Sequence, residues 1–451
     1  MKLLIQNGCV IDPGAGVHEM RDLWVADGKI VSAADQPDRV IDASGKIVCP
    51  GFIDIHMHED PVGADGQIEA YEESSVFSCM LHMGVTTAVA GNCGENKYHP
   101  ADYLDLADRS GLPVNVAMLA GHEYFRRRAG CTNRYDPATA KQITQMSREV
   151  REALERGCVG VSFGIRYTPG MDARELIQTA AACRGSGKLV AAHIRDDAAY
   201  VFDAGREFLD AGLALGTPLQ LSHIGSMAGF GQMEDFLALV DDYRRIQPDI
   251  ACDCYPYDAF STALGSTTYD EGWKERYGCG YDAVELCEGP DKGQRCTEEI
   301  FNRQRRENPG CMTVCHVMRQ EEVDLAYRHE AVMVASDSTL NQGQGHPRAC
   351  GTFPRVLSRY VKNGIFTLDE AIRRMTALPA RQLGLPNKGG LSLGMDADLV
   401  IFDPKTVEDL ASFEAPLTPP AGIDWVLVNG CPALENGRIL ERRAGCAVRK
   451  F

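Results

Sequence analysis

Eight short apolar runs, spread along most of this 451-residue chain, constrain its fold more than any other feature. Polar or glycine residues follow each run, and helical stretches lie between them. Such alternation is typical of parallel strands joined by crossover helices, and eight units predict a closed (β/α)₈ barrel. The runs are residues 51–55, 86–90, 114–120, 159–162, 189–192, 219–222, 250–252 and 332–335.

The two ends of the chain have a different texture. The first ~45 residues read as short strands with turns at Gly and Asp, and 389–404 returns to strand-like alternation. We therefore predict an α/β protein with two domains, a small β-sandwich built from both termini (1–48 plus 386–451) and a catalytic barrel (49–385). The stretch 264–309, rich in Gly, Cys, Tyr and charge, is predicted to be an insertion that covers the barrel mouth or contacts substrate.

Composition narrows the classes of partner. The chain has 46 Lys and Arg against 63 Asp and Glu, and a formal net charge of -17 disfavours nucleic acids and anionic membranes. Its 17 cysteines, an odd number without Cys-x-x-Cys spacing, favour reduced thiols over a disulfide framework. The N-terminus lacks the apolar core of a signal peptide, and no run is long enough to span a bilayer, so we expect a cytoplasmic location.

Candidate metal ligands stand where the predicted strands end. In an extended strand, residues two apart face the same side, so the first unit presents a His-x-His pair. Residues at the carboxyl ends of barrel strands converge on one face, which predicts one shared site. A thiolate, imidazoles and a carboxylate together suit zinc. The candidates are His56, His58, Cys93, His193, His223 and Asp337.

Each candidate also has an ordinary structural interpretation on its own. A His-x-His pair can be two surface histidines near a turn, and His193 or His223 can be a core histidine with satisfied hydrogen bonds. Cys93 can be a small buried side chain, and Asp337 a loop acid or helix N-cap. Their joint occurrence at successive strand ends favours the metal site.

Longer motifs make the chain similar to the amidohydrolase superfamily and, within it, to the N-acyl-D-amino-acid deacylases, also called D-aminoacylases. The resemblance runs over nearly the whole chain. It implies hydrolysis of a linear amide by an enzyme that contains zinc. The motifs are Gly-Phe-Ile-Asp-Ile-His-Met-His-Glu-Asp (51–60), Gly-Asn-Cys-Gly (91–94), His-Ile-Arg (193–195), Tyr-Pro-Tyr (255–257), Ser-Thr (261–262), His-Pro-Arg (346–348), Gly-Thr-Phe (351–353) and Gly-Met-Asp-Ala-Asp-Leu-Val (394–400).

The resemblance also implies a division of the ligands. Many amidohydrolases bridge two metals with a carbamylated lysine at the fourth strand, but residues 160–170 contain no lysine. In the D-aminoacylase group a cysteine after the second strand takes that role, and Cys93 stands there. The resemblance assigns one tightly bound zinc to Cys93, His193 and His223. It assigns a second, weaker position to the remaining ligands, namely His56, His58 and Asp337.

Roles in the reaction follow from the chemistry and the resemblance together. Zinc activates water and polarises the carbonyl, and we expect Asp337 to take the proton from the water and pass it to the leaving amine. Arg348 suits the α-carboxylate of an N-acyl amino acid because its guanidinium is two-pronged. The resemblance adds Tyr167 and Ser261 to that carboxylate site. The preference for D-amino acids comes from the resemblance alone.

Side-chain selectivity and competing functions stay open at this point. The family often has His-His-Lys after the sixth strand, whereas this chain has His-Ile-Gly at 223–225, which argues against an acidic side chain. Another amide, such as a cyclic ureide or imide or an isoaspartyl dipeptide, is the nearest alternative. A catalytically inactive binding protein and a thiol redox protein are more remote. A homo-oligomer is compatible with the sequence.

Overall fold

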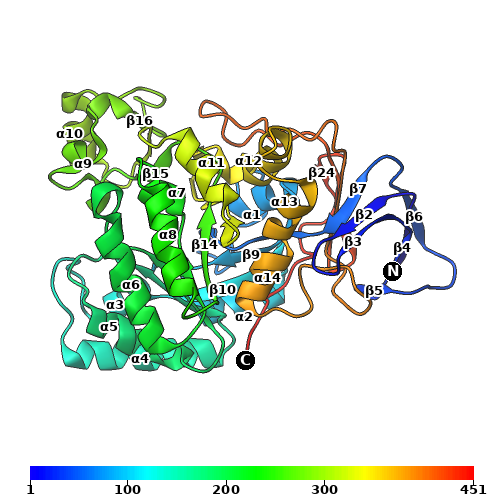
Figure 1. Cartoon of the computed structure of the whole chain (residues 1–451), viewed down its shortest axis with the longest axis horizontal. Coiled ribbons are helices and arrows are strands. Elements are labelled where there is room, and N and C mark those ends of the chain that lie inside the picture. Colours follow the sequence, from blue (N-terminus) through cyan, green and yellow to red (C-terminus); the bar gives the residue numbers. More distant parts are fainter.

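The computed structural model describes residues 1–451 and contains the predicted eight-stranded parallel barrel (Figure 1). Each predicted run overlaps one barrel strand. The last strand and the first do not form a regular ladder with one another. The loops that follow them close the ring, because Asp337 N donates to His56 O (2.8 Å) and His58 N donates to Ser338 O (2.9 Å). The strands in order are β8 (Phe52–Asp54), β9 (Val85–Ala90), β10 (Asn115–Gly121), β11 (Gly160–Gly164), β12 (Leu189–His193), β13 (Leu219–Leu221), β14 (Ile250–Cys254) and β18 (Val332–Val334).

Amphipathic helices surround this barrel. The longest, α4, begins at a capping box in which Thr139 accepts from the backbone of Gln142, and it buries an apolar stripe at Ile143, Met146, Val150 and Leu154. Each helix covers the apolar outer face of neighbouring strands, which produces one large core. The helices are α1 (Val76–His82), α2 (Pro100–Ser110), α3 (His122–Arg128), α4 (Ala140–Glu155), α5 (Ala173–Thr179), α6 (Val201–Leu215), α7 (Ile224–Ala228), α8 (Met233–Arg244), α11 (Gln320–Arg328), α12 (Arg348–Arg355), α13 (Leu368–Met375) and α14 (Ala377–Leu383).

A second, smaller core lies between two sheets formed by both ends of the chain, as predicted. The strand from the C-terminal half, β21, pairs with β7 in antiparallel register, Val400 opposite Cys49. Figure 1 shows this β-sandwich beside the barrel, with the N-terminus in it. One sheet has β5 (Lys29–Val31), β4 (Leu23–Ala26), β1 (Lys2–Gln6) and β6 (Arg39–Asp42). The other has β24 (Arg438–Ile439), β23 (Cys431–Glu435), β22 (Ile423–Val428), β21 (Leu399–Phe402), β7 (Ile47–Pro50), β2 (Cys9–Asp12) and β3 (Val17–Met20).

The last residues of the chain leave the sandwich and return to the barrel. Leu112 N donates to Gly445 O (3.0 Å), Val116 N to Cys446 O (3.0 Å) and Lys450 N to Gly157 O (3.0 Å). This tail therefore runs beside the start of β10, at the end of the barrel opposite the strand carboxyl ends. The domain boundaries stated above stay a prediction.

The predicted insertion folds as a small sheet with helices at the barrel mouth. Its sheet consists of β15 (Phe260–Ala263), β17 (Met312–Cys315) and β16 (Val284–Leu286), so the strands begin just before residue 264 and end just after 309. Two helices, α9 (Trp273–Tyr277) and α10 (Glu298–Glu307), pack on one another through stacked Trp273 and Phe301, with ring centroids 5.3 Å apart. The insertion is therefore an ordered unit with its own packing.

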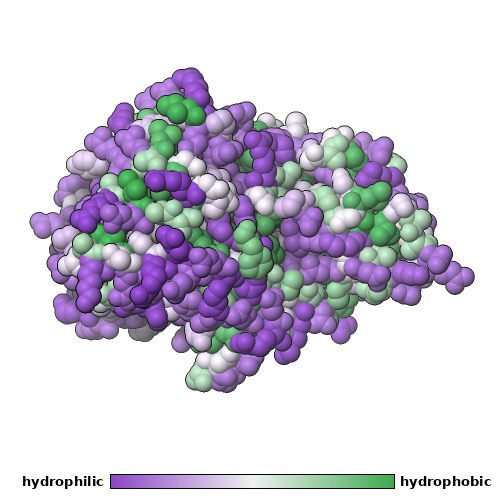
Figure 2. Space-filling model, turned by 90° about the horizontal axis from the view of Figure 1, so that it is seen from below, coloured by the Kyte–Doolittle hydropathy of each residue, from purple (hydrophilic) through white to green (hydrophobic).

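The visible surface of the molecule is mostly polar. Figure 2 shows one face of the molecule as mostly hydrophilic, with hydrophobic residues in small separate groups. None of the helices is both long enough and apolar enough to cross a bilayer.

Candidate metal centre

The barrel brings the six predicted ligands together at its carboxyl end. His193 is the last residue of β12, and the others lie two to four residues after the ends of their strands. The donor atoms fall into two groups, each with all its atoms within 4.8 Å of one another. One group is Cys93, His193 and His223, and the other is His56, His58, Cys93 and Asp337.

Cys93 lies at the centre because it belongs to both groups. Its Sγ is 3.4 Å from His56 Nε2, 3.4 Å from His223 Nε2 and 4.0 Å from His193 Nδ1. Asp337 Oδ1 is 3.3 Å from His58 Nε2 and 3.4 Å from His56 Nε2. Soft and borderline donors around one buried point fit zinc, and the shared thiolate lies where a bridging ligand is needed in a site without a lysine on β11.

The backbone is strained at three of these six residues. Cys93, His223 and Asp337 have φ values of 52°, 35° and 49°, in the left-handed region that side chains other than glycine rarely adopt. Such strain costs on the order of 1–3 kcal/mol per residue and persists where the surrounding structure holds it for function. The sharp turns point these side chains inward directly after the strands.

Electrostatic interactions set the protonation of the cluster. Burial would raise the pKa of the Cys93 thiol, but the imidazoles of His56 and His223 hold it well below its ordinary value, so the thiolate is favoured. Burial and the neighbouring His223 lower the pKa of His193 to about 4, which keeps its imidazole neutral. For His58, the carboxylate of Asp337 outweighs burial and raises the pKa to about 9. A thiolate and a neutral imidazole are the forms that bind metal.

Asp253, at the end of β14, orients this cluster from behind. Its carboxylate lies 3.3 Å from His56 Nδ1, and it accepts hydrogen bonds from His223 N (2.7 Å) and Gln220 Nε2 (2.5 Å). A carboxylate on the second nitrogen of a metal-binding histidine fixes the ring and its tautomer. Asp253 is not among the residues predicted from the sequence to form the metal site, although the thirty-residue spacing from His223 places it at a strand end.

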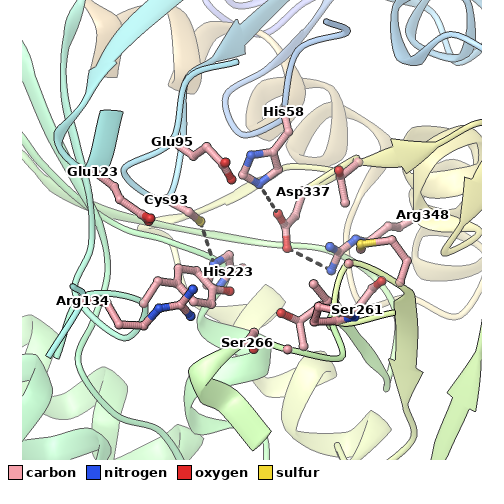
Figure 3. Close-up of a pocket in the computed structure, with 18 residues that line it drawn as sticks. His58, Cys93, Glu95, Glu123, Arg134, His223, Ser261, Ser266, Asp337 and Arg348 are labelled. Carbon is pink, nitrogen blue, oxygen red and sulfur yellow. Dashed lines mark hydrogen bonds and ion pairs between the residues drawn. The ribbon is translucent and has the colours of Figure 1, made fainter. Parts of the chain in front are cut away.

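The cluster opens into a cavity of about 420 Å³, which Figure 3 shows in close-up. Arg348, at the start of α12, is 2% exposed and stacks on Tyr255, with its guanidinium carbon 4.6 Å from the ring centroid. Its Nη1 lies 2.9 Å from Asp337 Oδ2, but neither Nε nor Nη1 makes a directed hydrogen bond. Ser261 Oγ is buried without a partner, and Tyr167 lines the same wall. These groups offer unused donors beside the ligand cluster.

A smaller compartment of about 20 Å³ adjoins the cavity behind His193 and His223. No lysine or arginine lines it, whereas Asp197 does. Asp197 accepts a hydrogen bond from Tyr277 of the insertion (2.6 Å) and lies 3.6 Å from Arg276 Nε. The remaining lining residues are Tyr167, Ser226, Met227, Tyr255, Phe260, Ser261, Thr262, Thr268 and Asp337.

Comparison with known proteins identifies the family. The model of the amidohydrolase family matches residues 39–433. The chain belongs to this family. Among curated proteins, this amidohydrolase is 34% identical to the N-acyl-D-glutamate deacylase of Alcaligenes xylosoxydans xylosoxydans, over 99% of this chain and 98% of the relative. It is 31% identical to the D-aminoacylase of the same organism, over 98% of both chains.

A solved structure gives the same result. The crystal structure of N-acyl-D-glutamate deacylase from Bordetella bronchiseptica, complexed with zinc and a phosphonate inhibitor that mimics the tetrahedral intermediate, matches with a TM-score of 0.88 at 31% identity. The match covers 99% of each chain. The predicted fold, a (β/α)₈ barrel with a sandwich from both termini, is therefore confirmed.

Proposed function

We propose that this amidohydrolase uses zinc to hydrolyse the amide bond of N-acyl-D-amino acids, which releases a carboxylic acid and a free D-amino acid. One observation carries the proposal: two ligand groups that share Cys93 meet, in one cavity, a buried arginine with unused donors. The names of the relatives support the acyl substrate and the D configuration. The bound zinc and the inhibitor of the structural relative support the metal and the type of reaction.

In this proposal Cys93, His193 and His223 would hold the tightly bound ion, and His56, His58 and Asp337 would form the weaker position. When bound, zinc supplies a Lewis acid that activates water and polarises the amide carbonyl. Because Cys93 lies within 3.4 Å of donors in both groups, its thiolate would be a ligand available to either position. The donor types and their burial fit zinc.

Asp337 moves the proton. Burial would raise its pKa, but Arg348 and the imidazoles of His223 and His56 hold it well below the ordinary value, so the carboxylate is ionised. An ionised carboxylate accepts the proton of the attacking water, and it then donates this proton to the departing amine nitrogen. Without that transfer, the poor leaving group would re-form the amide.

Arg348 holds the α-carboxylate of the substrate. The substrate carboxylate would replace Asp337 as a partner for part of the guanidinium, whose planar edge supplies two parallel N–H donors. Ser261 and Tyr167 add hydroxyl donors on the same wall. The stacking on Tyr255 keeps the guanidinium plane in place.

The side chain of the amino acid points toward the small compartment, and we propose that it is neutral. Asp337 would repel a second carboxylate there, and no lysine or arginine lines the compartment to pair with it. Gly225, which stands where the family often has lysine, has no room for a side chain, since a Cβ there would lie 2.9 Å from Cys254 Sγ. We therefore expect a side chain other than the one in the name of N-acyl-D-glutamate deacylase.

The decisive experiment measures amine release from N-acetyl-D- and N-acetyl-L-amino acids (Ala, Ser, Met, Leu, Glu), with zinc quantified in the same protein. We expect hydrolysis of the neutral D substrates and little of D-Glu. Hydrolysis of L substrates, or none of any linear amide by zinc-loaded protein, would contradict the proposal and favour cyclic amides or dipeptides.

The cytoplasm is the proposed location. All 17 cysteines are free thiols in the structure, and a reducing compartment preserves that state.

A further inference from the structure

Arg134 lines the outer part of the cavity and has no counter-ion. It lies in the loop 129–139 between α3 and α4, and Figure 3 shows its side chain extending into the cavity near Glu123. It is half-buried, and its guanidinium makes no hydrogen bond or ion pair within the chain. The other arginine of the cavity, Arg348, lies opposite it and forms an ion pair with Asp337.

The loop that carries Arg134 is held in place by a buried arginine. Arg126 donates from Nη1 to Asn133 O (3.1 Å) and Cys131 O (3.5 Å), and from Nη2 to Asp136 O. The backbone of Arg134 itself accepts a hydrogen bond from Gly170 N (2.9 Å). The cation is therefore presented at a defined position.

The neighbouring carboxylates do not neutralise Arg134. Glu123 is paired with Arg127 at 2.9 Å, and Glu95 is exposed on the side of the cavity near His58. Neither forms an ion pair with Arg134. A positive charge at the wall of a cavity, free of internal partners, favours an anionic group of the ligand.

We propose that Arg134 is a specificity-determining residue that binds a carboxylate at the far end of the acyl group. The inference rests on the proposed function, in which Arg348 takes the α-carboxylate and the small compartment takes the side chain. The acyl group is then left with the outer part of the cavity, and the cavity as a whole, at about 420 Å³, is larger than an N-acetyl amino acid requires. The preferred substrates are monoamides of dicarboxylic acids, such as N-succinyl-D-amino acids.

The test compares two substrates of matched length, N-succinyl-D-methionine and N-butanoyl-D-methionine, with the zinc-loaded enzyme. We expect the wild type to favour the succinyl substrate in kcat/KM. Arg134→Ala should lower kcat/KM for the succinyl substrate about ten- to hundredfold and leave the butanoyl substrate unchanged, because one charge-assisted contact is lost. Arg134→Lys should restore part of the preference, since lysine keeps the charge without the fork.

A matched control removes an arginine outside the cavity. Arg148, on α4, is 67% exposed, and Arg148→Ala should leave both substrates unchanged. Raising the salt from about 0.05 to about 0.5 M should reduce the succinyl preference of the wild type but not that of Arg134→Ala. An equal effect of Arg134→Ala on both substrates, or a wild type that prefers butanoyl, would overturn the inference. Butanoyl hydrolysis would still support the proposed function, whereas hydrolysis of neither substrate would overturn both.

Discussion

Two buried polar clusters in this protein each contain histidine and a carboxylate and use them differently. In the loop anchor, formed by His122, Arg126 and Glu175, Glu175 Oε1 accepts from Arg126 Nε (2.9 Å) and lies 2.8 Å from His122 Nε2. The remaining donors of Arg126 go to backbone carbonyls. In the metal centre, thiolate, imidazole and carboxylate atoms instead face one another at 3.3–4.0 Å.

The difference separates structure from chemistry. The anchor satisfies nearly all of its hydrogen-bonding groups internally, with His122 Nδ1 the exception, and so it holds the Arg134 loop. The metal centre brings lone pairs together with few donors between them, an arrangement that a cation stabilises. Substitutions in the metal centre should therefore affect zinc binding and turnover, whereas substitutions in the loop anchor should affect stability.

The largest loss of activity is expected for Cys93→Ala. Because Cys93 belongs to both ligand groups, the variant should lose bound zinc and fall below detectable turnover. Zinc per chain and amine release measure this in one preparation. Cys446→Ala, which removes an exposed thiol, should keep both. Full zinc content in Cys93→Ala would show that the comparison of the clusters is wrong.

Asp337→Asn should lower kcat about 10²- to 10⁴-fold, since the amide cannot accept and return the proton. The tightly bound zinc should remain, because Cys93, His193 and His223 are intact. Steady-state kinetics with zinc analysis would check both points. A variant with the wild-type rate would remove Asp337 from proton transfer.

Arg348→Ala should lower kcat/KM for N-acyl-D-amino acids roughly 10- to 100-fold, the value of a hydrogen-bonded ion pair with the α-carboxylate. The amide derivatives of the same substrates, which lack that carboxylate, should lose much less. Arg355→Ala, on the same helix but paired with Asp409 outside the cavity, is the control. Equal losses on acid and amide substrates would place the carboxylate elsewhere.

Glu175→Gln should have the smallest effect on turnover and act on stability instead. It leaves the buried charge of Arg126 unpaired and should lower the free energy of unfolding by about 3 kcal/mol, measured by denaturant titration at neutral pH. Zinc content and kcat for N-acetyl substrates should be retained. Loss of zinc from the folded variant would contradict the structural role of the anchor.

The same variant has a defined pH dependence. Burial would raise the pKa of Glu175, but the hydrogen bonds and charges of His122 and Arg126 hold it below its ordinary value of 4.5. The stabilisation is therefore complete above pH 4.5 and is lost as the pH falls through the lowered folded-state pKa. Wild type and Glu175→Gln should converge in stability in acid.

His122 shows why the sequence alone does not distinguish a metal-binding histidine from a structural one. It directly follows β10, and His223 likewise follows the end of β13, so position along the chain does not distinguish the two. In the structure it begins α3, pairs with Glu175 and does not line the cavity. Its partner is 53 positions away, and no local pattern specifies that contact. The roles of Arg134 and Asp253 could not be predicted from the sequence for the same reason, because they depend on residues that are distant in the chain.

The amino-acid sequence alone determined the eight-unit barrel, the sandwich built from both termini and the set of side chains that follow the strands. These features depend on short-range periodicity and on the rule that parallel strands end on one face. Only the tertiary structure decided that Cys93 stands between two ligand groups, that Arg348 rests on Asp337 and that Arg134 is left without a partner. These contacts are set by packing between segments far apart in the chain. A shift of a few ångströms decides whether a polar side chain faces a ligand site or forms an ion pair within the protein.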